Sequence, residues 1–238
     1  MTQDTKHWFK NPNTSWNLRR KDSEYHFDPT LNDNNYPGLR SNFVQFKGDW
    51  QSEIDNSKFE ESPPFDTSNY LTRIAVQDQI ELGIDHRCEG KRMTVNPTNH
   101  PKIQKIVSSL GLAKSYAQIL ILKTGEYFQY HIDQIACQVA YAPKRHESPD
   151  LKEVLADESS IRLFIALEDW QWGHYMIMGN YHWVQWKAGD TLWFRWQDMP
   201  HGSFNCGHKN RPMLKVTGEI TDKFKSLLEK KNHVININ

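Results

Sequence analysis

Three residues with the chemistry of metal ligands are the most informative feature of this sequence. His131 and Asp133 lie two positions apart, and His201 follows a further candidate strand later in the chain. Side chains at positions i and i+2 of a β-strand project from the same face, so one metal ion can bind both His131 and Asp133. Two imidazole nitrogens and one carboxylate oxygen leave three octahedral positions open, an arrangement that suits Fe(II). The spacing therefore predicts a metal site formed by His131, Asp133 and His201.

A second copy of the same tripeptide pattern shows that context must decide between them. His26 and Asp28 have the same spacing, but they follow a charged run and precede Pro29, which disfavours a buried strand. His131 instead follows two apolar, strand-like segments that can hold it rigidly. The alternative interpretation of His131 and Asp133 is an ordinary buried ion pair.

Arg211 predicts an anion-binding position close to the metal. It lies ten residues after His201, and if His201 ends one strand and Arg211 begins the next, a hairpin places both in one pocket. A guanidinium in a largely apolar barrel needs an anion, and its planar fork suits a carboxylate. The alternative is an arginine paired with a local Asp or Glu. Gly189 and Asp190 are expected to form a tight turn, from which the Trp-rich strand at 191–196 begins.

The elements that must position these residues are mostly short strands. Residues 103–110 have helical periodicity, with Gly111 placed to cap the helix. A short helix is expected over 222–230. Between the two helices, strand-like segments dominate. They are residues 117–122, 127–133, 138–141, 161–167, 175–178, 182–186, 191–196 and 213–219. Many short strands separated by Gly and Pro predict a β-sandwich or barrel with a helix on one side. The charged segment 142–160 is either solvated surface or a lid over the metal site.

Residues 1–95 are harder to interpret, because turn signals recur and only short strand-like runs (41–46 and 71–76) interrupt them. The region is too aromatic for disorder. We therefore expect an irregular N-terminal region, 1–95, packed on a core domain, 96–238, as one structural unit.

Composition narrows the range of partners. The 29 basic and 29 acidic residues balance, which gives no reason to expect nucleic acid or an anionic membrane. No apolar run approaches the roughly 20 residues of a membrane helix. The three cysteines are far apart, which predicts a reducing, cytoplasmic location.

Tryptophan is unusually frequent, and six of the nine lie between Trp170 and Trp196. They predict either a packed β core or the lining of a substrate cleft. Trp183 and Trp193 alternate with their neighbours, so some rings must face outwards. Those rings need a cover, either the N-terminal region or a second copy of the chain in a homodimer.

Over about residues 115–220, these features resemble the Fe(II)/2-oxoglutarate-dependent oxygenase superfamily, with its His-x-Asp…His…Arg signature on a mainly β, double-stranded β-helix (jelly-roll or cupin-like) core. The resemblance implies that His131, Asp133 and His201 bind Fe(II) and that Arg211 holds the C5 carboxylate of 2-oxoglutarate. It also implies that O2 converts 2-oxoglutarate to succinate and CO2 while the substrate is hydroxylated. Desaturation and related oxidations share this chemistry, whereas Asp133 argues against halogenation.

Some positions depart from the family pattern. Family arginines are often followed two places on by a serine that helps to hold the C5 carboxylate, but Met213 occupies that place here. Tyr127 and Gln129, which we expect on the strand face of His131, are the candidate replacements.

The segment around Arg162 looks most like the aspartyl/asparaginyl and prolyl hydroxylase-like branch, in which an arginine at this position meets a carboxylate of substrate or co-substrate. Asp133 departs from the aspartyl hydroxylases proper, which lack the metal carboxylate. The resemblance thus implies an amino-acid, peptide or other small carboxylate-bearing substrate. A cupin-type metal enzyme that does not use 2-oxoglutarate and a non-catalytic, Trp-lined binding module are the competing hypotheses.

Overall fold

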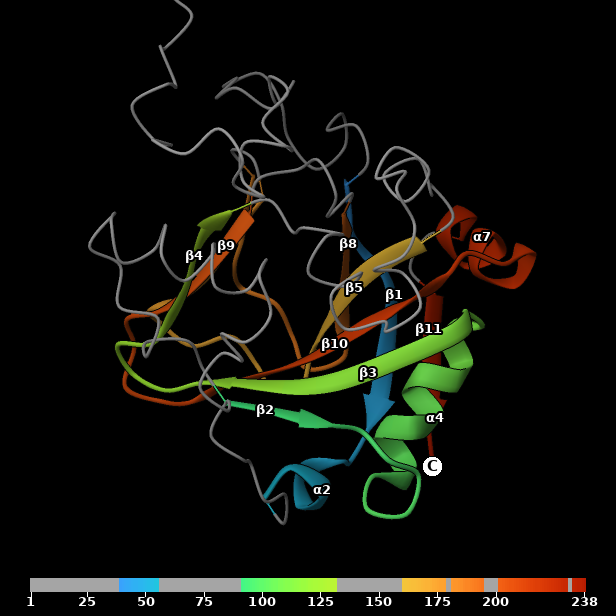
Figure 1. Cartoon of the computed structure of the whole chain (residues 1–238), viewed down its shortest axis with the longest axis horizontal. Coiled ribbons are helices and arrows are strands. Elements are labelled where there is room, and N and C mark those ends of the chain that lie inside the picture. Colours follow the sequence, from blue (N-terminus) through green and yellow to red (C-terminus); the bar gives the residue numbers. More distant parts are fainter. Residues whose placement is uncertain (1–38, 56–90, 132–159, 179–180, 195–200, 231–232) are drawn as a thin grey trace, which may run out of the picture.

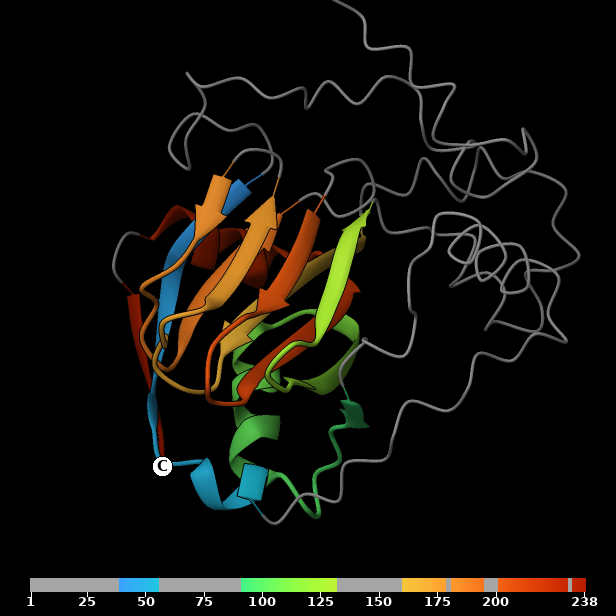
Figure 2. The same cartoon turned by 90° about the vertical axis from the view of Figure 1, so that its left-hand side faces the viewer.

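Two β-sheets lie face to face in a computed structural model that describes residues 39–55, 91–131, 160–178, 181–194, 201–230 and 233–238 (Figures 1 and 2). The seven-stranded major sheet has the order β11-β1-β8-β5-β10-β3-β2, and the four-stranded minor sheet has the order β4-β9-β6-β7. The strands are β1 Leu39–Gly48, β2 Lys91–Thr94, β3 Ala113–Leu122, β4 Tyr127–His131, β5 Ser160–Ala166, β6 His174–Met178, β7 Tyr181–Trp183, β8 Asp190–Phe194, β9 His201–Asn205, β10 Arg211–Glu219 and β11 His233–Ile237. The helices are α2 Gln51–Asp55, α4 Pro101–Leu110 and α7 Asp222–Glu229.

Chain order defines the architecture as a double-stranded β-helix. From β3 to β10 the chain passes repeatedly between the two sheets, and every pairing among these strands is antiparallel. In Figure 2 the minor sheet faces the viewer, in front of the major sheet. The protein is therefore mainly β with a jelly-roll core and few helices, as the sequence predicted.

Each face of the major sheet packs against a different partner. The outer face packs against the helices, and Ile103 of α4 and Phe224 of α7 share one apolar cluster with Ile119 of β3. The inner face packs against the minor sheet, and Met213 of β10 shares a second cluster with Met176 of β6. Side chains alternate between faces along each strand, so these clusters show which residues point between the two sheets.

The α4 helix forms as its sequence predicts. Its four apolar residues are buried, and Gly111 ends it with φ of 71°, in the left-handed region that glycine adopts readily. The predicted strand at 182–186 is shorter than expected, because Gln185 has φ of 58° and turns the chain. Strands β2, β9 and β11 were not expected from the pattern.

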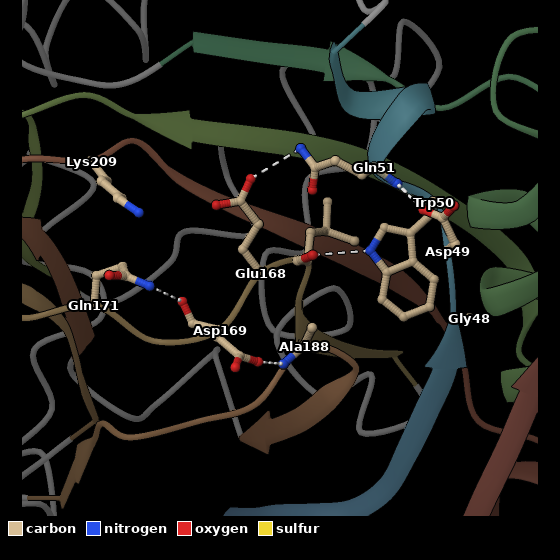
Figure 3. A pocket seen from close by; sticks show the side chains of 10 residues that line it. Gly48, Asp49, Trp50, Gln51, Glu168, Asp169, Gln171, Ala188 and Lys209 are labelled. Atoms are coloured by element: carbon tan, nitrogen blue, oxygen red, sulfur yellow. Dashed lines mark hydrogen bonds between the residues drawn. The ribbon is translucent and has the colours of Figure 1, made fainter.

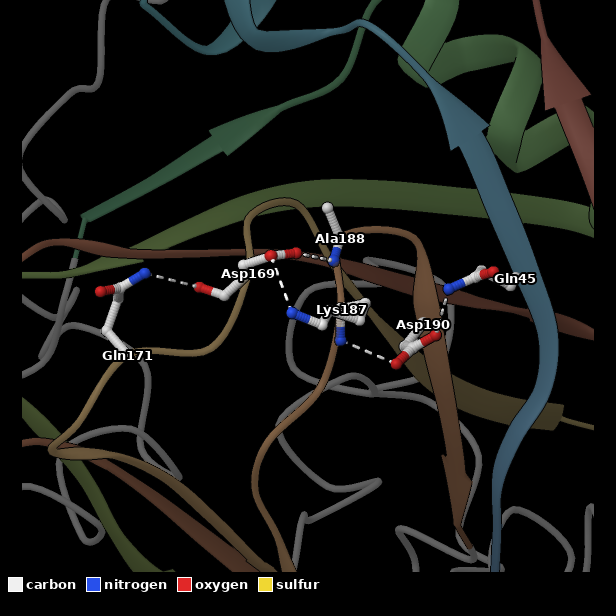
Figure 4. Close-up of polar contacts among 6 residues, drawn as sticks. All are labelled: Gln45, Asp169, Gln171, Lys187, Ala188 and Asp190. Atoms are coloured by element: carbon white, nitrogen blue, oxygen red, sulfur yellow. Dashed lines mark hydrogen bonds and ion pairs between the residues drawn. The ribbon is translucent and has the colours of Figure 1, made fainter.

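A tight turn opens β8, as predicted. Gly189 has φ of 85°, and a Cβ at this position would lie 1.8 Å from the carbonyl oxygen of Phe46. The carboxylate of Asp190 accepts hydrogen bonds from the backbone N–H of Lys187 (2.8 Å) and from the side chain of Gln45 (3.0 Å) (Figure 4). Burial raises the pKa of Asp190 above its usual value, although these two hydrogen bonds oppose that shift.

Part of the N-terminal region belongs to the sheet itself. Strand β1 lies between β8 and β11, with Phe46 and Val44 fully buried. Residues 39–48 are thus integrated into the core rather than packed against it. The predicted strands at 71–76 and 138–141 and the charged segment up to residue 159 lie outside the described residues.

The tryptophans divide between several environments. Trp183 is buried between the sheets, where its ring contacts that of Trp186 (4.8 Å between centroids). Trp193 instead packs against the apolar cluster on the helix side, so residues of the same chain cover it. Trp172 is 80% exposed. Along the described segments, no helix combines the length and apolar character needed to cross a bilayer.

Candidate active site

His201 is the first residue of β9, and its imidazole lies between the two sheets. The side chain is buried, and its ring centroid is 4.6 Å from that of Phe194, with an angle of 62° between the rings. Because Phe194 belongs to β8 of the major sheet, this contact places the imidazole of His201 on the inner face of the minor sheet.

The backbone brings His131 and His201 together. Strand β4 runs antiparallel to β9, and the two histidines are directly paired in its register. Paired residues in antiparallel strands have Cα atoms about 4.5–5.5 Å apart. The two predicted ligands thus occupy neighbouring positions at one end of the minor sheet.

A β-bulge in β4 produces this pairing. Phe128 pairs with Ser203, and the next recorded pair is His131 with His201, so three steps along β4 match two steps along β9. The side chain of His131 and the whole of Asp133 lie outside the described residues. Among the side chains that are described, no three His, Cys, Asp or Glu residues form a metal-binding group. The three-ligand site therefore remains a prediction.

Arg211, the first residue of β10, is a buried cation with few partners. Its side chain is 4% exposed, and Nη1 donates one hydrogen bond of 3.3 Å to the backbone oxygen of Tyr175 in β6. Within the described part of the chain, its Nε is buried without a hydrogen-bond partner, and no carboxylate there forms an ion pair with the guanidinium. Burial lowers the pKa of Arg211 to about 9. Among the described residues, the buried guanidinium thus has no carboxylate to balance its positive charge.

The route from His201 to Arg211 differs from the predicted hairpin. His201 begins a strand rather than ending one, and β9 and β10 belong to different sheets. Residues 206–210, here called the anchor loop, carry the chain from the minor to the major sheet. The Arg211 side chain returns across the barrel to Tyr175, which pairs with Phe204. Phe204 is three residues from His201, or about 10 Å along the strand at 3.3 Å per residue.

Tyr127 does not share the face of His201. It pairs with Phe204, and their rings stack with centroids 6.3 Å apart and an angle of 19° between planes. Phe204 alternates with the inward-facing His201 and Ser203, so Phe204 and Tyr127 lie on the outer face of the minor sheet. The expectation for Tyr127 assumed unbroken alternation along β4, and the bulge removes it. The side chain of Gln129 lies outside the described residues.

Arg162 lies on the inner face of the major sheet. It is buried and donates from Nε to the hydroxyl of Thr217 (3.2 Å). It also pairs with Phe194 of β8, the residue that contacts the ring of His201. Arg162 therefore lies toward the His201 end of the barrel, whereas the side chain of Arg211 lies toward the other end.

His174 was missed as a residue of the Arg211 region. The two histidines His174 and His182 are eight residues apart and could suggest a second metal pair, but His182 pairs with Ile177 and so faces the opposite side of the minor sheet. The His174 imidazole is buried and stacks on Trp186 (6.4 Å, 18°), and its Nε2 lies 3.0 Å from the carbonyl oxygen of Lys209. Burial lowers the pKa of His174; its hydrogen bond to Lys209 opposes this shift, and the charge of Arg211 adds to it. The sequence could not have predicted this contact, because any residue at position 209 would provide the same backbone carbonyl.

A surface cleft of about 360 Å³ lies elsewhere, between the end of β1 and the segment that follows β5 (Figure 3). Trp50 in this cleft donates from its indole N–H to the carbonyl of Leu167 (3.0 Å), and Gln51 donates to Glu168 (3.2 Å). None of the predicted site residues lines the cleft. The cleft therefore does not include the candidate metal and anion residues, although Lys209 of the anchor loop lines it.

No protein family model matches this chain, and no curated protein is similar to it in sequence. Several solved structures resemble its fold. A prolyl-4-hydroxylase from Pseudomonas putida is 14% identical with a TM-score of 0.41, and the match covers 62% of this chain and 83% of that one. An RmlC-like cupin from Shewanella frigidimarina is 10% identical with a TM-score of 0.32, over 59% and 85% of the two chains. A cupin-superfamily sugar phosphate isomerase from Silicibacter pomeroyi is 10% identical with a TM-score of 0.30, over 54% and 60%.

Proposed function

We propose that this chain is a non-haem Fe(II)- and 2-oxoglutarate-dependent dioxygenase that hydroxylates an amino-acid, peptide or other small carboxylate-bearing substrate. The observation that carries the proposal is Arg211, a buried guanidinium with an unpartnered Nε and no described carboxylate beside it. A dicarboxylate co-substrate supplies the missing negative charge through its distal carboxylate, and the arginine fork can bind that group through two hydrogen bonds.

The paired histidines supply the second part of the argument. His131 and His201 are opposite each other in register at one end of the minor sheet. Asp133 follows His131 by two residues, and His131, Asp133 and His201 would hold the Fe(II). The register places Arg211 toward the other end of the barrel, so a ligand extending from the metal to Arg211 would lie along the inner face of the minor sheet.

Iron, 2-oxoglutarate and O2 together supply an oxidant that hydroxylates a C–H bond, while 2-oxoglutarate yields succinate and CO2. The residues of the chain perform the remaining tasks. Arg211 binds and orients the co-substrate carboxylate. Phe194, Met178 and Leu192, which belong to the apolar cluster between the sheets, keep water away from the reacting region. Arg162 lies at the His201 end and would orient a carboxylate of the substrate.

Anaerobic titration with Fe(II) and 2-oxoglutarate tests this proposal. The wild-type protein should develop the weak visible metal-to-ligand band of the chelate, and His201→Ala should lose it. His182→Ala is the matched control, since His182 is exposed on the opposite face of the same sheet and should leave the band unchanged. Absence of the band from the wild-type protein would contradict the proposal.

A cupin-type metal enzyme that does not use 2-oxoglutarate would suit the same fold and the same paired histidines. Such an enzyme has no need of a buried arginine at position 211 whose Nε lacks a partner among the described residues. Substrate turnover that persists in Arg211→Met would therefore favour it, whereas a non-catalytic binding module would bind no iron at all.

A further inference from the structure

One backbone oxygen two residues before Arg211 receives hydrogen bonds from two buried side chains. The carbonyl of Lys209 accepts from Nδ2 of Asn205 at 2.8 Å and lies 3.0 Å from Nε2 of His174. Asn205 ends β9 and His174 begins β6, so both donors belong to the minor sheet. Lys209 belongs to the anchor loop, which leads directly into Arg211 of the major sheet. These hydrogen bonds thus hold the anchor loop, which precedes Arg211, against the minor sheet that contains His201.

Asn205 fixes the anchor loop at further points. Its Nδ2 also donates to the carbonyl of Leu122 (2.8 Å), which pairs with Arg211 across β3 and β10. Its Oδ1 accepts from the backbone N–H of Gly207 (2.9 Å). The loop is therefore held near both of its ends, and its final residues can move little without breaking a buried hydrogen bond.

We propose that His174 and Asn205 are positioning residues, which hold the anchor loop so that the guanidinium of Arg211 stays aligned to bind a carboxylate. The assignment of that carboxylate to 2-oxoglutarate rests on the function proposed above. The positioning role concerns the chain's own hydrogen bonds and applies to any dicarboxylate that Arg211 binds.

The chemistry of His174 suits this role. A backbone carbonyl only accepts, so Nε2 carries the proton and donates it to Lys209. Burial lowers the pKa of His174, which favours the neutral ring beside the positive charge of Arg211. A neutral donor fixes the loop without adding a second buried cation next to the guanidinium. Stacking on Trp186 fixes the plane of the ring and hence the direction of the N–H.

Two substitutions separate the hydrogen bond from the bulk of the ring. His174→Gln keeps an N–H donor near the position of Nε2, and His174→Leu removes the donor at a similar volume. Two measurements apply to each variant. One is the affinity for glutarate, a five-carbon dicarboxylate without the keto group, obtained from the ligand-dependent rise in melting temperature. The other is the affinity of the Fe(II)-loaded protein for 2-oxoglutarate, obtained from the visible band.

We expect His174→Leu to weaken binding of both dicarboxylates about three- to tenfold, the range that one hydrogen bond of ordinary strength provides. His174→Gln should restore most of the affinity, and Fe(II) affinity without 2-oxoglutarate should be unchanged in both. A merely structural role predicts a lower melting temperature with unchanged dicarboxylate affinities, and that result would overturn the proposal. If His174→Leu does not fold, His174→Asn replaces it, since this amide is too short to reach Lys209.

The same experiment distinguishes failure of this inference from failure of the proposed function. In one outcome, glutarate stabilises the wild type but not Arg211→Met, and 2-oxoglutarate gives no visible band. This result would reject the oxygenase, and the glutarate affinities would then decide whether His174 has the positioning role. Equal affinities in the wild type, His174→Leu and His174→Gln would reject the positioning role alone. A wild-type protein that neither dicarboxylate stabilises would reject both.

Discussion

Replacing Arg211 with methionine should make the ligand-free protein more stable. Burial lowers the pKa of Arg211 well below its usual range, to about 9, so keeping the buried guanidinium charged costs on the order of several kcal/mol. The hydrogen bond to Tyr175 offsets part of this cost. Apolar replacements of even buried ion pairs are often neutral or stabilising by about 1–4 kcal/mol, and we expect a similar gain for this guanidinium. For a chain of this size we expect a rise of a few to about 10 °C in melting temperature.

A dicarboxylate should reverse this order of stability. At a hundred times its Kd, a ligand stabilises the folded protein by about 2.7 kcal/mol, so glutarate or 2-oxoglutarate should raise the melting temperature of the wild type. Arg211→Met should show no such rise. Arg40→Met is the control, because Arg40 is exposed on β1 and its replacement should change the stability by less than about 0.5 kcal/mol.

Thermal denaturation with and without ligand, followed by fluorescence or calorimetry, measures both effects. A ligand-free Arg211→Met protein clearly less stable than the wild type would refute the reasoning. It would show that the guanidinium stabilises the ligand-free fold and does not need a bound carboxylate to balance its charge.

Further predictions concern the metal site and β8. His201→Ala should weaken Fe(II) binding by at least about tenfold, measured by anaerobic titration, because a direct ligand should count for at least as much as its hydrogen-bonding partners. Asp190→Asn should flatten the dependence of stability on pH. Because the pKa of Asp190 is raised in the folded state, the folded protein binds this proton more readily than the unfolded chain does. The wild type should therefore become more stable as the pH falls through that raised pKa toward 3.8, and the variant should not. Urea denaturation at several pH values measures this difference, and an unchanged slope in Asp190→Asn would contradict it. Gly189→Ala should cost about 3 kcal/mol or more in the same denaturation assay, because its Cβ would overlap the carbonyl oxygen of Phe46 and φ is positive; wild-type stability would show that the turn can rearrange.

The parts of the fold with regular apolar spacing could be predicted from the sequence. Ile103 and Leu110 recur at helical intervals, and α4 forms there with its glycine cap. The apolar runs of β3, β5 and β10 likewise predicted strands, because these strands have apolar residues on both faces. Such patterns arise directly from burial, so residue types alone are enough to locate them.

The strand that carries the candidate site could not be found in this way. The inward positions of β9 are His201, Ser203 and Asn205, so the strand lacks the apolar alternation that marks a buried face. Asn205, for example, donates hydrogen bonds to the carbonyls of Leu122 and Lys209 instead of filling an apolar core. Where polar residues replace apolar side chains on an inner face, the alternation that predicts a buried strand is lost.

Two features of the site depend on backbone geometry. The bulge between Phe128 and His131 leaves no compositional signal, yet it moves Tyr127 to the outer face. The contact from His174 ends on a main-chain carbonyl that any residue at position 209 would provide. The sequence thus predicts that Arg211 is an anion anchor, but it gives no indication of which residues would align its guanidinium.

The position of β1 has a consequence for how the chain folds. β1 pairs with β8 and with β11, strands that come roughly 150 and 190 residues later in the sequence. Pairings between such distant segments form slowly, because much of the chain must be ordered before they close. Until β11 pairs with β1 during folding, Val44 and Phe46 lie on an unpaired strand at the edge of the sheet. Strands of separate molecules associate at such edges. Aggregation during synthesis or refolding should therefore depend on how quickly the His233–Ile237 strand covers β1.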